Sequence, residues 1–309
     1  VVQPVIEVAL GSAQTSSEAA ATDLATRIAS SSVNLTTTSS GSIVEVTAIN
    51  GYEIESVNAS DSFGNGASFG WGHQVDVQSS LPKNMGSYTP LVQIGNTDRD
   101  AFWMLYTSGI WKEHYEIGID TEVDADFMPH VARVRNNPIS GYDEFYIEKF
   151  DWESLTVGNN ITNKVPRYLD TDFNAPITDI FFYRNRMGLL TSGSVSLSEV
   201  GEYGNFFRTS VAALLDGDRI DTGMESRIAV NAEYATVFDD SVVFFSDKSQ
   251  FRFESDDILS PSSYKITEIT YYPVDLTIRP VVINDKIFFV TRRGIYSAVF
   301  EMHISNSST

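Results

Sequence analysis

The chain has 309 residues, no cysteine, and a formal net charge of −20 that comes from 41 acidic and 21 basic side chains. That length allows two domains or one large all-β domain. The absence of cysteine excludes disulfides, thiolate catalysis and cysteine-ligated zinc. The acidic balance argues against tight nucleic-acid binding, which depends on clustered Lys and Arg. Because no run of about 18 apolar residues occurs, no membrane span is predicted.

The first 123 residues are predicted to form a small α+β domain. The first residues have no signal-peptide pattern and no initiator methionine, so we expect a piece or a processed product of a longer protein. Thr15 and Glu18 fit a capping box, and apolar residues then recur at helical spacing to about Ala29. A Ser/Thr-rich turn follows this helix, and Gly/Ser/Asn-rich loops are expected from Tyr52 to Gly72. Strands are expected at 42–49, 90–94, 101–106 and 109–113.

Residues 124–309 are predicted to be mainly β and to contain a repeated unit. The units span 177–199, 233–254 and 278–301. Each has an apolar strand, a charged or amide turn, a nearly continuous apolar strand and an alternating strand. A continuous apolar strand is covered on both faces, so the middle strand of each unit should be the most buried.

The spacing of these units is typical of a β-propeller. The middle strands begin at Met187, Val242 and Ile287, which gives steps of 55 and 45 residues. A weaker fourth unit is predicted as a hairpin of 129–134 with 144–150. The chain would then hold three to four blades of a partial or complete propeller. Helical spacing between 205 and 222 predicts an inserted helix.

Candidate chemical residues are more simply explained as structural. The histidines His73, His114, His130 and His303 lack a metal-binding spacing. The acids Asp216, Asp218 and Asp221 miss the calcium-loop pattern, and we interpret them as a turn that caps the inserted helix. The glycines Gly64, Gly66, Gly70 and Gly72 lack the helix that a phosphate cradle needs, which favours an exposed loop.

Carboxylate pairs such as Asp124 with Asp126, or Asp256 with Asp257, occur by chance among 41 acids. The sequence therefore assigns no catalytic, cofactor-binding or metal-binding residue, and we expect no cofactor and no enzyme. Two alternatives stay open. One is a receptor- or polysaccharide-binding propeller, with exposed aromatics in 63–72 and at Trp103 and Trp111. The other is a carboxylate-based polysaccharide-cleaving tail enzyme.

Several segments, taken in order, match the motifs of one known protein family. The N-terminal segments are 18–28, 76–82 (DVQSSLP) and 108–113 (SGIWKE). The later ones are 126–133 (DFMPHVAR), Trp152 with 156–163 (TVGNNITN), 177–190 (ITDIFFYRNRMGLL), 195–198 (VSLS), 204–207 (GNFF), 218–221 (DRID), 244–251 (FFSDKSQF), 259–262 (LSPS) and 279–281 (RPV). In this order, the segments resemble the tail nozzle proteins of short-tailed bacteriophages of the podovirus type, also called tail tubular protein B. Phe127 stands where the family has Thr, and Arg219 where it has Pro, so the chain resembles a distant member.

The resemblance implies a non-enzymatic virion protein of the phage tail, made in the cytoplasm of the host bacterium. Nozzle proteins form a homohexameric tube that binds an adaptor ring, receives tail fibres and lets DNA pass during ejection. The family combines a β-propeller with a platform-like domain and is longer than this chain. A net charge of −20 suits a lumen through which DNA passes without tight binding.

Overall fold

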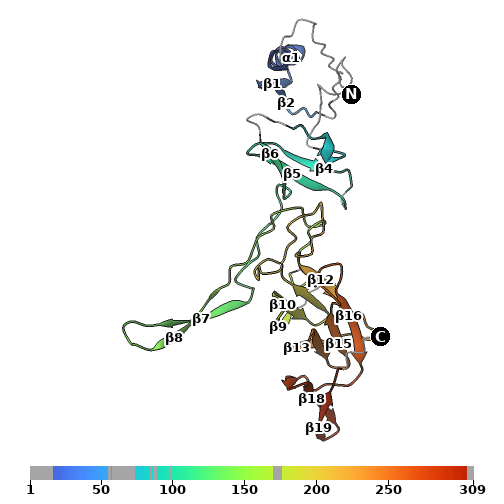
Figure 1. Cartoon of the computed structure of the whole chain (residues 1–309). Helices are drawn as coiled ribbons and strands as arrows, with labels where there is room; N and C mark the ends of the chain where they lie inside the picture. The colour runs from blue at the N-terminus through green and yellow to red at the C-terminus, as the bar shows by residue number, and fades with distance from the viewer. Residues whose placement is uncertain are drawn as a thin grey trace. The chain divides into compact units, whose positions relative to one another are not determined.

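The computed structural model describes residues 17–54, 57, 74–83, 85, 89–97, 99–169 and 176–304 (Figure 1). These residues form nineteen strands, one α-helix and one 3-10 turn, which confirms the mainly β class. The chain divides into two compact units between His114 and Tyr115. The expected division into 1–123 and 124–309 stays a prediction.

The first unit begins with a helix on a two-stranded ribbon. Helix α1 (Ser17–Ser31) buries Ala21 and Ala25, one turn apart, and the Thr37 hydroxyl donates to the Ala25 carbonyl at 2.8 Å. The predicted helix is therefore confirmed, while Thr15 and most of 52–72 lie outside the described residues. Strands β1 (Leu35–Ser40) and β2 (Ile43–Ala48) pair antiparallel. The predicted Ser/Thr-rich turn is wrong, because β-branched threonines favour the extended backbone that β2 supports.

A four-stranded sheet completes the first unit. It has the order β3 (Gln74–Val75), β4 (Leu91–Ile94), β5 (Phe102–Thr107) and β6 (Ile110–His114), with a 3-10 turn at Gln78–Ser80. Ser108 (φ 52°) and Gly109 (φ 83°) make the tight turn between β5 and β6. Trp111 donates its indole N–H to the Pro82 carbonyl at 2.7 Å. The strands predicted at 42–49, 90–94, 101–106 and 109–113 are all present.

The second unit contains three antiparallel meanders. The first sheet is β9 (Ile177–Tyr183), β10 (Arg186–Thr191), β11 (Ser194–Leu197) and β12 (Ile220–Gly223). The second is β13 (Ala232–Phe238), β14 (Ser241–Ser246), β15 (Gln250–Glu254) and β16 (Lys265–Thr270). The third is β17 (Val281–Ile283), β18 (Lys286–Arg293) and β19 (Tyr296–Met302).

The turns between the first two strands of each sheet lie where the sequence predicts them. Arg184 and Asn185, then Asp239, and then Asn284 adopt positive φ values between 46° and 59°. Tight hairpin turns require this left-handed backbone, and Asn and Asp tolerate it better than most other side chains.

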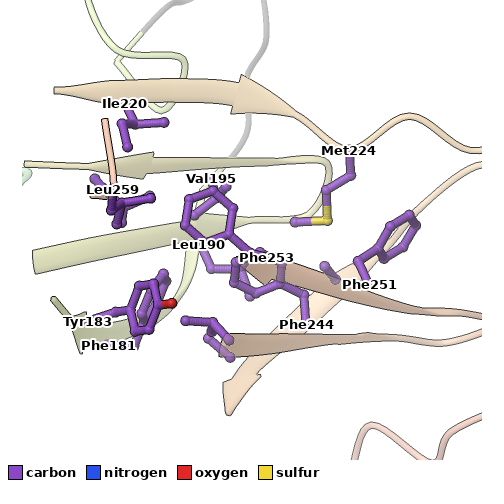
Figure 2. Close-up of a cluster of buried hydrophobic side chains, with 14 residues drawn as sticks. Phe181, Tyr183, Leu190, Val195, Ile220, Met224, Phe244, Phe251, Phe253 and Leu259 are labelled. Carbon is purple, nitrogen blue, oxygen red and sulfur yellow. The ribbon is translucent and has the colours of Figure 1, made fainter. Parts of the chain in front are cut away.

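The second sheet is buried on both faces. Val242 and Phe244 of β14 face the first sheet, in the core that Figure 2 shows with Phe181 and Leu190. Val243 and Phe245 of β14 face the third sheet and belong to a separate core. Every residue of β14 is buried, as is every residue of β10. The predicted burial of the middle strands is confirmed for the first two sheets.

The third sheet differs, because only one face of β18 is fully covered in the described residues. Its buried residues alternate with partly exposed ones, so Ile287 and Phe289 point inward while Phe288 and Val290 point outward. The three sheets do not close into a ring within the described part of the chain. A propeller is therefore not confirmed beyond the mainly β class.

The inserted helix predicted at 205–222 is wrong. The segment forms turns that lead into β12. Two of the apolar side chains that gave the helical spacing, Leu214 and Leu215, are 55% and 46% exposed, whereas Phe207 is buried. Polar side chains capture the backbone instead, since Asn205 accepts from the Phe207 N–H and Asp218 from the Leu215 N–H.

A separate hairpin of the second unit joins β7 (His130–Asn136) to β8 (Asp143–Lys149), as the sequence predicts. It stands away from the meanders of its unit as the green arm in Figure 1. Most of its residues are exposed.

Candidate functional site

The histidines of the described residues do not form a metal centre. Among the described residues, no group of three or more His, Cys, Asp or Glu side chains could hold a metal ion. His130 Nδ1 lies 2.9 Å from the Met128 carbonyl, and both His130 and His303 are exposed. His73 lies outside the described residues. Likewise, no helix in the described part of the chain has the length and apolar character needed to cross a membrane.

The carboxylates of the Asp216–Asp221 segment hold a loop rather than an ion. Asp218 is buried, and its oxygens accept from the Thr209 N–H, the Thr209 hydroxyl and the Leu215 N–H at 2.9–3.2 Å. Asp221 accepts from the Ser196 hydroxyl at 2.6 Å. The predicted turn that caps an inserted helix is wrong, because no helix forms here; Asp218 and Asp221 instead hold the loop and the strand that follows it.

The predicted acid pairs bind lysines. Asp126 lies 2.7 Å from Lys149, whose hydrogen bond holds the pKa of Asp126 below its usual range. Asp256 forms an ion pair with Lys265. In each pair, one carboxylate is thus engaged by a lysine, whereas glycoside hydrolysis uses two carboxyl groups that face one bond.

A buried arginine joins loops of the first two sheets. Arg186 is fully buried, and its two terminal nitrogens donate to the carbonyls of Ser198, Asp216, Asp218 and Leu259 at 2.6–3.3 Å. Burial lowers the pKa of Arg186 from its ordinary value. The planar guanidinium suits this role because it presents several donors in one plane. Sequence reasoning placed Arg186 within the 177–190 segment but gave it no role of its own.

A second charged residue ties together the first strands of the three meanders. Asp179 of β9 accepts from the Ala235 N–H of β13 at 2.8 Å, and both its oxygens accept from Arg279, which precedes β17, at 2.6 and 3.0 Å. The Arg279 guanidinium also lies 5.3 Å from the centre of the Tyr234 ring. This contact sets the three first strands side by side.

One surface hollow has a volume of about 710 Å³ and a mainly apolar lining that includes Met128, Tyr168 and Ile177. Burial raises the pKa of the Tyr168 hydroxyl. The carboxylate that lines the hollow belongs to Asp179, whose oxygens are already occupied by Arg279 and Ala235. Among the described residues, therefore, the lining of the hollow supplies no acid without a partner.

The remaining candidate surface is the hairpin β7–β8. Val134, Phe145 and Ile147 are 55%, 80% and 75% exposed, which is unusual for large apolar side chains of a β-strand. The sequence predicts the hairpin itself, but alternation alone cannot tell which face a partner covers.

Comparison with known proteins agrees with this framework. The family described as bacteriophage nozzle protein matches residues 7–309. The chain belongs to the bacteriophage nozzle protein family. The motif segments of the sequence lie in the elements that build the sheets: Arg186 and Gly188 in β10, and Phe244 to Phe251 across the turn from β14 to β15.

A curated relative of the same kind is the tail tubular protein gp12 of Escherichia phage T7. This nozzle family chain is 26% identical to it over 260 residues, which is 83% of the chain and 32% of the relative. The chain thus spans about a third of the length of the curated relative that it matches.

Proposed function

We propose that this chain is a structural part of the tail tube of a short-tailed phage, in the nozzle through which DNA is ejected into the host. The observation that carries the proposal is membership of the nozzle family over residues 7–309, together with the resemblance to a tail tubular protein. Its place would be the tail of the virion, after synthesis in the cytoplasm of the host bacterium.

The buried charges support an architectural role. Arg186 and Asp179 are occupied by backbone groups and by Arg279, and these contacts hold sheets together. This use of the charges supports a non-enzymatic role. The net charge of −20 fits a conduit for DNA, because clustered basic side chains in a lumen would retard a polyanion.

The arrangement of the meanders favours a β-propeller preceded by a platform-like domain. In a propeller each blade is a meander whose first strand lies nearest the central axis. Here Asp179 brings the first strands of three successive meanders together. Residues 124–309 would supply these blades, and residues 1–123 the platform. A homohexameric ring, with an adaptor ring and tail fibres as neighbours, completes the proposal.

The test is cryo-electron microscopy of the assembled particle with the full-length protein. We expect a six-fold ring at the distal end of the tail, with the fold of residues 177–302 placed in each subunit. A particle whose tail ring lacks this chain would overturn the proposal, and so would a chain that remains monomeric.

The two alternatives gain no support from the described residues. Trp103 is 7% exposed and Trp111 donates to Pro82, so neither lines an open groove for a glycan. The whole aromatic loop at 63–72 lies outside the described residues. The carboxylate pairs suggested for polysaccharide cleavage bind Lys149 and Lys265.

A further inference from the structure

The hairpin β7–β8 is an amphipathic ribbon with its apolar face open. Val134 pairs with Phe145, and Ala132 with Ile147, so these four side chains share one face. All four are exposed, and Phe145 is exposed by 80%. An apolar face of this kind on a soluble ribbon indicates a contact surface.

The opposite face already has its partners within the ribbon. Arg133 forms an ion pair with Glu148, and Arg135 lies 4.0 Å from Glu144. The Arg135 guanidinium also lies 5.5 Å from the centre of the Tyr146 ring. This charged face is suited to contact with water. The ribbon therefore has one polar face and one apolar face, although it has no core of its own.

The tip enlarges the apolar surface. Ile139 and Tyr142, in the loop between the strands, are 94% and 77% exposed. The hairpin thus carries five large exposed apolar side chains, namely Val134, Ile139, Tyr142, Phe145 and Ile147. If each of them buries on the order of 100 Å², the ribbon contributes ~500 Å² to the interface, against ~800 Å² per partner in a standard interface. An isolated two-stranded hairpin is only marginally stable in water, so such a contact would also stabilise the arm.

We propose that the apolar face of β7–β8 binds a second copy of this chain, as an arm that reaches the neighbouring subunit of the tube. This inference rests on the proposed function. A cyclic ring needs a heterologous interface, in which one patch of a subunit meets a different patch of the next. An arm whose apolar face is exposed among the described residues supplies one side of such an interface.

The charge distribution favours a second copy as the occupant. Two copies each carry −20, so they repel one another over most of their surfaces. The hairpin carries three basic residues (Arg133, Arg135, Lys149) and three acidic ones (Asp143, Glu144, Glu148) and contributes none of that net charge. Contact through this neutral ribbon therefore adds little repulsion between copies.

The first experiment places a photo-reactive p-benzoylphenylalanine at Phe145 of the full-length protein, in a mixture of isotopically labelled and unlabelled copies. Glu144, the next residue on the opposite face, is the matched control position. We expect cross-links between labelled and unlabelled copies, at least fivefold more abundant from position 145 than from position 144. Cross-links from 145 that stay within one chain, or that join a different tail protein, overturn the proposal.

The second experiment measures assembly by mass photometry. Phe145→Glu should weaken self-association at least tenfold, whereas Glu144→Gln should assemble as the wild type does. Because Phe145 is exposed, the circular dichroism spectrum of the variant should be unchanged. If Phe145→Glu forms wild-type rings, the arm proposal fails while the tube proposal stands. If the wild-type protein forms no ring, both fail.

Discussion

Gly188 gives the sharpest test of how the first two meanders pack. It lies in β10, directly opposite Phe181 of β9. A Cβ atom added at Gly188 would lie 2.2 Å from Cζ of Phe181 and 2.5 Å from both of its Cε atoms. Carbon atoms in favourable contact are about 3.5 Å apart or more, so the ring would have to move by more than ~1 Å. Phe181 is buried and packs edge-on against Phe244, with 5.7 Å between the two ring centres. This contact leaves the Phe181 ring little room to move.

The magnitude follows from two opposing effects of Gly188→Ala. Forcing an extra methyl group into a packed core costs ~1–3 kcal/mol, and the upper end applies to a ring held by the facing sheet. Replacing glycine in a strand returns ~0.5–1 kcal/mol through the unfolded chain. We expect a net loss of about 2 kcal/mol in the free energy of unfolding, which at ~2 kcal/mol per molar lowers the urea midpoint by ~1 M.

The control is Gly193→Ala, in the turn between β10 and β11. A Cβ at Gly193 has no atom within 4 Å, so the unfolding free energy should change by less than ~0.5 kcal/mol. Phe181→Leu, which shortens the opposing side chain, should partly rescue Gly188→Ala, with a favourable interaction energy of at least ~1 kcal/mol. Equal midpoints for the two alanine variants, or strict additivity with Phe181→Leu, would refute the packing argument.

Three further predictions concern the buried and paired charges of the second unit. Arg186→Met should cost about 3 kcal/mol of unfolding free energy, because four carbonyls lose a charged donor while the desolvation cost of the charge is removed; urea unfolding measures it. A double-mutant cycle of Asp179→Ala with Arg279→Ala should give a coupling energy of about 1 kcal/mol, since Arg279 is half exposed. The Thr277 hydroxyl, followed by Arg292, holds the pKa of Asp275 below its ordinary value. This depressed pKa stabilises the fold above pH ~4, and the stabilisation is lost as pH falls through the folded pKa, so Asp275→Asn should flatten the decline of the thermal midpoint below pH 4.

The sequence predicts the meanders well because the signals for burial and for turns both come from residues that lie close together in the sequence. Val242 to Phe245 form an unbroken apolar run, and the structure buries alternate residues of that run in two different cores. Asp239 and Asn284 mark the turns because their side chains tolerate a left-handed backbone. Spacing, apolar continuity and turn residues are thus enough to place most strands.

The contacts between sheets could not be predicted in this way. Arg186 binds carbonyls from segments up to 73 residues away, and Arg279 binds an acid 100 residues away. Nothing in the local pattern distinguishes these arginines from surface ones. The helix prediction for residues 205–222 failed for the opposite reason. The apolar spacing is helical, but the side chains of Asn205 and Asp218 accept hydrogen bonds from backbone N–H groups that a helix would use.

These long-range contacts also decide how the acidity of the chain should be interpreted. An excess of carboxylates is compatible with catalysis, with ion binding, or with a surface that repels DNA. The buried carboxylate of Asp218 binds the N–H groups of its own loop, and that of Asp179 binds Ala235 and Arg279. Interior acids in the described second unit therefore fix the backbone, whereas acids such as Asp126 and Asp256 are exposed. Exposed acids act on their surroundings at long range, and salt weakens this effect.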